Sequence, residues 1–276
     1  MVTKLRDAVY GVAVGDALGS PVQFQDRGTY PQVKEMMYCD CFGKEAGTWT
    51  DDTSMTLALC DSIREKGRVD VEDIMDKFSA WLSLGRYTQD GRAFDIGNTC
   101  YEAVKRGKGL DDFYSNGNGS LMRIVPLAFV ESADDGVIDA VSSLTHAHAI
   151  SCEACRIYIH IARDLLSGKP ARDAVNGNVR EVSKTFAPLA SIGSRTRESI
   201  RSSGFVVDTL EAALWCLLTT DSFRAAVEAA VNLGEDTDTV GAVTGGLAGI
   251  LYGYDAIPAS WISALRKKEM LEACLF

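Results

Sequence analysis

The sequence has little that would suit a nucleic acid or a membrane. Its 276 residues include 28 Lys and Arg against 38 Asp and Glu, which gives a formal net charge of −10. No basic run exceeds Arg266-Lys267-Lys268, so a surface for a phosphate backbone is not indicated. The longest apolar stretch, residues 239–252, is interrupted by glycines and is shorter than the roughly 20 residues that a membrane span needs. We therefore expect no membrane association and no sequence-specific binding of nucleic acid.

The N-terminus also lacks the apolar region of an export signal, so we expect a cytoplasmic protein whose eight cysteines are reduced. His146, His148, Cys152 and Cys155 have the residue types and the number of a zinc site. The two cysteines fall one turn apart on a predicted helix, residues 150–166, whereas structural zinc ligands usually come from turns. Buried thiols on a helix are therefore the favoured interpretation of this segment.

Helical periodicity dominates the chain, and alternating strand patterns are scarce. There is no linker or break in composition, so we expect an all-α fold in one compact domain, residues 1–276. Long irregular segments are expected at 19–49, 85–97, 107–120 and 169–204. Apolar residues recur at helical spacing in eleven segments: 5–18, 55–63, 71–84, 99–104, 121–130, 137–144, 150–166, 207–218, 223–233, 240–252 and 261–271.

Glycine forms two stripes with a four-residue period. The first contains Gly11, Gly15 and Gly19, and the second contains Gly241, Gly245 and Gly249. A glycine inside a helix costs up to about 1 kcal/mol relative to alanine, so two such stripes need a reason. One hypothesis is that they face each other and bring the two helices close together. The alternative is that each stripe packs separately in the core.

Two acidic runs lie far apart in the sequence, Thr50-Asp51-Asp52-Thr53 and Glu235-Asp236-Thr237-Asp238-Thr239. Each is placed at a predicted helix start, where free backbone N–H groups favour carboxylates. Both runs could be ordinary helix caps. Neither contains a Lys or Arg to pair the charge, however, and clustered carboxylates repel each other unless cations are bound. The runs therefore predict a pair of Mg²⁺ or Mn²⁺ ions.

Six segments together resemble the ADP-ribosylglycohydrolase family, which includes the dinitrogenase reductase-activating glycohydrolase and the ADP-ribosyl-acceptor hydrolases. They occur in the family's order and extend over nearly the whole chain: GVAVGDALG (11–19), GTWTDDT (47–53), FDIGN (94–98), GNGSLMR (117–123), THAH (145–148) and residues 234–246. The resemblance implies an all-helical domain that cleaves the bond between ADP-ribose and an acceptor.

By the same resemblance, two Mg²⁺ or Mn²⁺ ions would orient the ribose and activate a water molecule for attack. The implied metal ligands are Thr50, Asp51, Asp52, Asp236, Asp238 and Thr239. The loop implied to hold adenosine and diphosphate comprises Ser115, Asn116, Gly117, Asn118, Gly119 and Ser120, and it leads into a predicted helix near Leu121 whose start would suit an anion. Asp95, Asn98 and His146 are further candidates near the substrate, although a histidine at a helix start is often structural.

One position departs from the family pattern. The best-known hydrolases of the family have a glutamate in a Val-Glu-Phe context, whereas this chain reads Pro21-Val22-Gln23-Phe24. Glutamine can offer a carbonyl oxygen to a metal or a hydrogen bond to the substrate, but it cannot act as a base near neutral pH. Gln23 is therefore a candidate catalytic residue without a proton-accepting group, and the base would come from Asp95, Asp26 or Glu45.

Three functions fit these residues. The leading hypothesis is a hydrolase that removes ADP-ribose from a protein side chain, a nucleic acid or a small molecule. A metal-dependent phosphoester or pyrophosphate hydrolase would use the same two ions. A non-catalytic ADP-ribose-binding module is suggested by Gln23. The expected partner is ADP-ribose or an ADP-ribosylated acceptor, and the expected form is a monomer, although no sequence feature determines the oligomeric state or the acceptor linkage.

Overall fold

A computed structural model describes residues 2–276, and its regular secondary structure is helical throughout that range. Pairing between extended segments is limited there to three isolated bridges. The all-α prediction is therefore confirmed. The α-helices are α1 (Val2–Gly19), α2 (Asp51–Lys66), α3 (Val71–Leu84), α4 (Asn98–Arg106), α5 (Asp135–Ser142), α6 (Ala149–Leu166), α7 (Ala171–Asn178), α8 (Val206–Thr219), α9 (Phe223–Val231), α10 (Thr237–Tyr252), α11 (Ala259–Ala264) and α12 (Lys268–Cys274).

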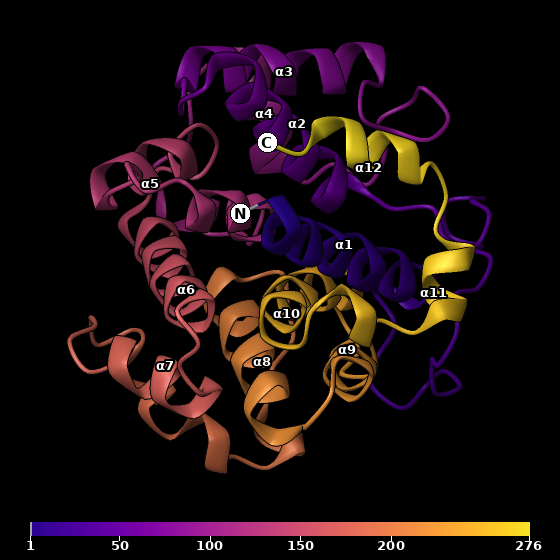
Figure 1. The fold of residues 1–276 in the computed structure, drawn as a ribbon, viewed down its shortest axis with the longest axis vertical. Helices are drawn as coiled ribbons and strands as arrows, with labels where there is room; N and C mark the ends of the chain where they lie inside the picture. The colour runs from indigo at the N-terminus through magenta and orange to yellow at the C-terminus, as the bar shows by residue number, and fades with distance from the viewer. Residues whose placement is uncertain (1) are drawn as a thin grey trace.

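Helices α1 and α10 lie side by side in the middle of the molecule, and the other helices surround them (Figure 1). The two glycine stripes form the contact between them. A Cβ atom added at Gly11 would lie 2.0 Å from the carbonyl oxygen of Gly245, and one added at Gly15 would lie 2.0 Å from that of Gly241. Only glycine allows the backbones to approach so closely, so the hypothesis that the stripes face each other is confirmed.

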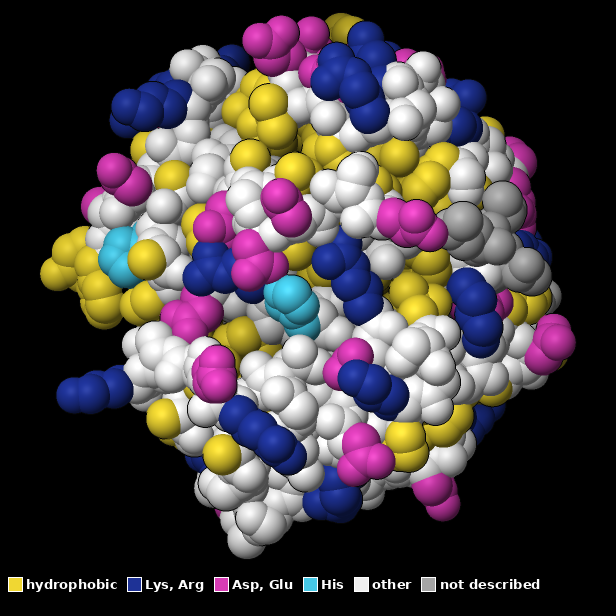
Figure 2. All heavy atoms as spheres, turned by 60° about the vertical axis from the view of Figure 1, so that its left-hand side comes forward, with side chains coloured by type: hydrophobic (Ala, Val, Ile, Leu, Met, Phe, Trp, Pro, Cys, Tyr) yellow, Lys and Arg dark blue, Asp and Glu magenta, His cyan; other side chains and the backbone are white. Residues whose placement is uncertain are grey.

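The surrounding helices complete one hydrophobic core. Helix α2 packs on α1 and α3, while α8 and α9 cover the other side of α10. Trp49, Trp81 and Trp261 are completely buried in this core. Across the face drawn in Figure 2, basic and acidic side chains are intermixed. No helix within residues 2–276 is long and apolar enough to cross a membrane.

Three of the predicted boundaries were wrong. Residues 121–130 form two 3₁₀ helices, Leu121–Arg123 and Val125–Phe129, because Pro126 lacks an N–H group and restricts the residue before it. The segment 261–271 is divided between α11 and α12 at Lys267, whose φ of 51° is left-handed. The segment 169–204, predicted to be irregular, contains the short helix α7, whose mixed composition conceals its periodicity.

Candidate active site

The two acidic runs begin α2 and α10, and the contact between α1 and α10 brings them together. Thr50 is the N-cap of α2, and its hydroxyl accepts a hydrogen bond from the N–H of Asp52. The Oδ2 atom of Asp52 then accepts hydrogen bonds from Thr50 Oγ1 at 3.1 Å and from Thr239 Oγ1 at 3.4 Å. Asp52 thus joins a hydroxyl of the first run to a hydroxyl of the second.

Asp16, on α1, lies beside these two helix starts. Carboxylate oxygens of Asp16, Asp52 and Asp238 all lie within 4.8 Å of one another, and the three side chains are buried. Asp16 already accepts hydrogen bonds from the N–H of Thr50 at 2.9 Å, from the N–H of Thr53 at 3.0 Å and from the hydroxyl of Thr53 at 2.6 Å. It therefore holds the start of α2. Asp16 lies in the segment GVAVGDALG (11–19), but no role was predicted for it from the sequence.

The remaining carboxyl groups have no basic side chain paired with them in the described part of the chain. Among the described residues, no Lys or Arg lies within ion-pair distance of Asp51, Asp52 or Asp238. Burial, followed by repulsion from neighbouring carboxylates, raises the pKa of all three well above its usual range. Three of their buried oxygens have no hydrogen-bond partner among the described residues: both oxygens of Asp238 and Oδ1 of Asp52. Hard oxygen donors in this state suit Mg²⁺ or Mn²⁺.

A cavity of about 260 Å³ opens directly over these carboxylates. It is lined by ten residues that the sequence singled out: Gln23, Asp51, Asp95, Asn98, Gly117, Asn118, Gly119, His146, Asp236 and Thr239. Thr50, Asp52 and Asp238 are buried beyond its lining. Lining residues without a predicted role are Phe24, Gly97, Thr99, Cys100, Met122 and Gly204. Three of these, Phe24, Gly97 and Met122, belong to the motifs of the active site described above but had no predicted role, whereas Gly204 belongs to no motif.

The glycine-rich loop forms one wall of the cavity. Its backbone pairs with residues 204–206, through Asn118 N–H to the Gly204 carbonyl and Val206 N–H to the Asn116 carbonyl, each at 3.0 Å. The amide of Asn118 donates to Asp236 Oδ2 at 2.8 Å, which ties this wall to the second acidic run. The buried guanidinium of Arg123 donates to the Gly119 carbonyl and secures the loop from behind.

Only part of the predicted substrate loop reaches the cavity. The side chains of Ser115, Asn116 and Ser120 instead contact Asp112, Ser151 and Ser142, respectively, at 2.6, 2.9 and 2.9 Å. These three residues brace the loop. The segment that follows is a three-residue 3₁₀ helix, so the expected anion site at a helix start beside Leu121 is not formed.

His146 lies against the glycine loop at the cavity wall. A Cβ added at Gly119 would be 2.8 Å from its Cε1 atom. Burial, together with the charge of Arg123, lowers the pKa of His146 to about 3, so the imidazole is neutral at physiological pH. The structure does not group His146, His148, Cys152 and Cys155 as metal ligands: His148 caps α6, and the Cys155 thiol contacts Ser120 at 3.5 Å.

Gln23 also lines the cavity, in a segment that is paired with the second acidic run. Phe24 N–H donates to the Glu235 carbonyl at 2.7 Å, and Glu235 N–H donates to the Gln25 carbonyl at 2.8 Å. The Oε1 atom of Gln23 is buried without a hydrogen-bond partner among the described residues. Phe24 has a left-handed φ of 64° and is 71% exposed.

Asp95 is the one candidate base that lines the cavity. It also has a left-handed backbone, with φ of 57°, and burial raises its pKa to about 6. Asp26 and Glu45, the other two candidates, are exposed and lie outside the lining.

Comparison with known proteins gives a consistent result. A sequence model of the family described as ADP-ribosylglycohydrolase matches residues 2–275. The ADP-ribosylarginine hydrolase Tri1 of Serratia proteamaculans is 35% identical over 284 residues, covering 97% of this chain and 76% of the relative. The ADP-ribosyl-[dinitrogen reductase] glycohydrolase of Rhodospirillum rubrum is 34% identical over 279 residues, covering 95% and 90%.

A solved structure shares the fold. It is described as an ADP-ribosylglycohydrolase-related protein complex, and it superimposes with a TM-score of 0.83 and 31% sequence identity over 99% of this chain and 95% of its own.

Proposed function

This chain belongs to the ADP-ribosylglycohydrolase family, and from that premise we propose that it hydrolyses the glycosidic bond between ADP-ribose and an acceptor. The observation that carries the proposal is the set of buried, unneutralised carboxylates from α2 and α10 beneath a cavity walled by a glycine-rich loop. An ordinary helix cap would not need so many acidic groups in one place.

The carboxylates and hydroxyls of Thr50, Asp51, Asp52, Asp236, Asp238 and Thr239 would hold two Mg²⁺ or Mn²⁺ ions. Such ions, when bound, orient sugar hydroxyls and lower the pKa of water. Asp16 fits this set less well, because its oxygens are already occupied by Thr50 and Thr53. Asp16 would instead fix the start of α2, so that Asp51 lines the cavity and Asp52 lies beneath it.

The chain's own groups would position the sugar and accept the proton. Gly119 lets the loop pack closely on His146, and Asn118 holds Asp236 in place. The backbone of Gly117 and Gly119 lines the cavity, where a diphosphate would bind. Asp95 is placed to take a proton on its buried Oδ2, which has no other partner among the described residues. Gln23 would offer its free Oε1 as an acceptor to a ribose hydroxyl.

The acceptor that fits the cavity best is an ADP-ribosylated arginine. Asp51, Asp95 and Asp236 line the cavity, whereas none of its lining residues is a Lys or Arg, so a cationic leaving group is favoured over a neutral one. Phe24 exposes its ring beside Gln23, where a planar guanidinium could stack on it. Two relatives at 35% and 34% identity are named as ADP-ribosylarginine hydrolases, which supports the same acceptor.

The test is an assay of ADP-ribosylated arginine, serine and asparagine compounds at saturating Mg²⁺ or Mn²⁺, with Asp51→Asn and the exposed control Asp40→Asn. We expect free ADP-ribose from the arginine compound, a loss of turnover in Asp51→Asn and none in Asp40→Asn. AMP and ribose phosphate as products would instead indicate pyrophosphate hydrolysis. Unaltered turnover in Asp51→Asn would contradict the proposed site.

A second candidate function is a module that binds ADP-ribose without cleaving it. It is favoured by the glutamine at position 23, because glutamine cannot act as a base there. The substitution Gln23→Glu separates the two. A gain of turnover would show that the cavity lacks a base at this position, whereas a loss would show that the amide itself is adapted to the reaction. Binding of ADP-ribose with no turnover of any acceptor in the wild type would favour the binding module.

A further inference from the structure

The turn of residues 39–44 brings two thiols together outside the cavity lining. Cys39 and Lys44 exchange two backbone hydrogen bonds, at 2.8 and 3.0 Å, which close the turn. Within it, the sulfur atoms of Cys39 and Cys41 lie 3.1 Å apart. Cys39 is buried, whereas Cys41 is the exposed member of the chain's eight cysteines. A solute can therefore reach one thiol, and a second thiol is already in contact with it.

Both thiols point at the same carbonyl oxygen. The Cys39 thiol donates to the Ser20 carbonyl at 3.4 Å and the Cys41 thiol at 3.7 Å. This carbonyl also accepts the N–H of Gln23 at 3.4 Å, and Ser20 is buried. Because Ser20 begins the 3₁₀ helix Ser20–Val22, which leads directly to Gln23, the two thiols support a segment that lines the cavity.

The same turn contacts the second loop that reaches the cavity. The rings of Phe42 and Phe94 lie 5.2 Å apart, and Lys44 Nζ lies 4.3 Å from the centre of the Phe94 ring. Lys44 also pairs with Asp90 at 2.5 Å. Phe94 precedes Asp95, so the turn lies between the segments that carry Gln23 and Asp95.

We propose that Cys39 and Cys41 form a reversible disulfide by thiol–disulfide exchange with a low-molecular-weight disulfide. The Cys41 thiolate attacks one sulfur of the oxidant, which releases one thiol and leaves a mixed disulfide. Cys39 then attacks the Cys41 sulfur and releases the second thiol. Two protein thiols are oxidised, one small disulfide is reduced to two thiols, and the protons of the protein thiols pass to the departing thiolates.

The geometry sets the order of these steps. Cys41 is exposed and Cys39 is not, so the oxidant reaches Cys41 first. Burial raises the pKa of Cys39 to about 12, so Cys39 stays protonated and must pass its proton to the departing thiolate as it attacks the mixed disulfide. The two sulfurs then need to approach by only about 1 Å, since a disulfide bond is about 2.05 Å long.

Closing the disulfide would remove both S–H donors from the Ser20 carbonyl. A buried carbonyl that loses its donors is destabilised, and here it would keep only the long bond from Gln23. The segment 20–25 would be less constrained as a result. Oxidation at the turn would thus be transmitted to one wall of the cavity without modifying any residue that lines it.

The first experiment treats the full-length protein with oxidised glutathione, alkylates the remaining thiols after denaturation and maps the peptides by mass spectrometry. We expect the wild type to lose two alkylatable thiols, Cys39 and Cys41, as one internal disulfide. Cys39→Ser should stop at a glutathione adduct on Cys41, and Cys41→Ser should not react. The matched control Cys152→Ser, from the buried pair Cys152 and Cys155, should behave as the wild type. Persistent glutathione on Cys41 of the wild type, or two free thiols, would overturn the proposal.

The second experiment tests the link to the cavity wall by hydrogen–deuterium exchange of residues 20–25. We expect faster amide exchange in the oxidised wild type than in the reduced protein, and no difference between the two treatments in Cys41→Ser. Unchanged exchange after complete disulfide formation would rule out the link. Neither readout depends on turnover, so both remain valid if the proposed hydrolase activity fails.

Discussion

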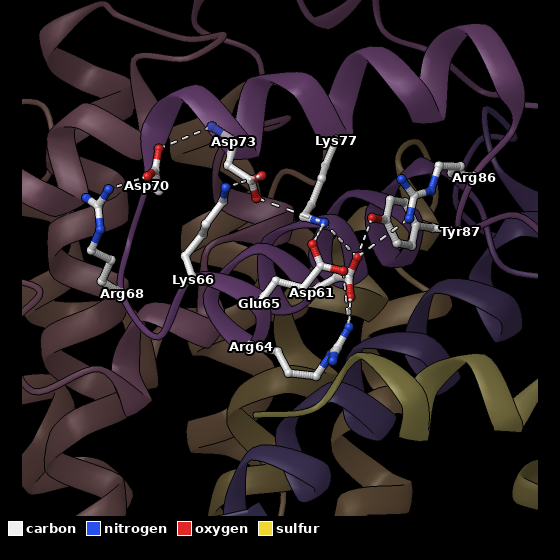
Figure 3. A network of polar contacts seen from close by, with 10 residues as sticks. All are labelled: Asp61, Arg64, Glu65, Lys66, Arg68, Asp70, Asp73, Lys77, Arg86 and Tyr87. Carbon is white, nitrogen blue, oxygen red and sulfur yellow. Dashed lines mark hydrogen bonds and ion pairs between the residues drawn. The ribbon is translucent and has the colours of Figure 1, made fainter.

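Helix α2 holds buried carboxylates near both of its ends, and the two groups have opposite surroundings. At its start, Asp51 and Asp52 have no Lys or Arg within ion-pair distance among the described residues. Near its other end, Asp61 accepts hydrogen bonds from Arg64 at 2.6 Å, from Tyr87 at 2.7 Å and from Lys77 at 2.9 Å (Figure 3). The residue type and the helix are the same, and both groups are buried.

The difference appears in the pKa values. At Asp61 burial alone would raise the pKa, but the hydrogen bonds from Lys77, Arg64 and Tyr87 outweigh it and hold the pKa below its usual range. At Asp52 burial and the repulsion of Asp16 and Asp236 act in the same direction, and the pKa rises well above that range. Asp61 is therefore satisfied by the protein itself, while Asp52 receives no counter-charge from Lys or Arg among the described residues. A buried acidic cluster indicates a ligand site when no Lys or Arg of the protein pairs with it.

We expect the largest effect from a substitution at the contact between α1 and α10, because this contact brings the unpaired carboxylates together. In Gly245→Ala the new Cβ would lie 2.1 Å from the Gly11 carbonyl oxygen, on the contact that brings α10 to α1. Such overpacking of two backbones should cost about 3 kcal/mol, measured by urea unfolding. The control Gly67→Ala lies at the other end of α2, with φ of 67° and no atom within 4 Å, and should cost only about 1 to 2 kcal/mol. Equal costs would show that the glycine contact is loose.

The second prediction removes one unpaired carboxylate. Asp238→Asn should lower kcat/KM more than about 100-fold, or about 2.7 kcal/mol, because a proposed metal ligand is lost. In the presence of a chelator the same variant should be at least as stable as the wild type, because one repelling charge has been removed. Mg²⁺ or Mn²⁺ at about 100 times its Kd should stabilise the wild type by about 2.7 kcal/mol and the variant by clearly less. Equal stabilisation of both proteins would contradict the assignment of Asp238.

The sequence predicted those parts of the site that depend on local chemistry. Asp and Thr at a helix start and glycines at a four-residue period are local patterns, and both acidic runs meet as expected. The role of Asp16 was missed because it depends on two N–H groups from a segment 34 to 37 residues away. No local pattern contains that information.

The direction in which side chains point was the other feature that the sequence did not predict. The string Ser115 to Ser120 reads as one binding loop, yet Ser115 and Ser120 turn toward Asp112 and Ser142. The contact with Ser142 exists only once α5 and the loop have packed together, whereas the contact with Asp112 is local to the loop. The helix predicted after Leu121 was wrong for a simpler reason, since Pro126 was visible in the sequence and should have ended it.

The third prediction tests the paired end of α2. Asp61→Asn should lower the free energy of unfolding by about 2 kcal/mol, because Lys77 is almost buried and would lose one of its two close partners. The free energy lost should be smaller than for a buried charge left without any partner, because Lys77 keeps its ion pair with Glu65 at 2.7 Å. Glu102→Gln breaks an exposed pair with Arg106 and should cost less than about 0.5 kcal/mol. Turnover per folded molecule should be unchanged in both variants, and a loss confined to Asp61→Asn would mean that the two ends of α2 are coupled.

The smallest expected effect is the pH dependence of the stability that Asp61 contributes. Because the folded pKa of Asp61 lies below its unfolded value of about 3.9, its contribution is complete above about pH 4 and is lost as the pH falls through the lower, folded value. The difference in unfolding free energy between the wild type and Asp61→Asn should therefore shrink on acidification. Both proteins keep the same carboxylates beneath the cavity, so the titration of that group cancels in the difference. A gap that stays constant down to about pH 2 would mean that packing of the Asp61 side chain, rather than its charge, stabilises this end of the helix.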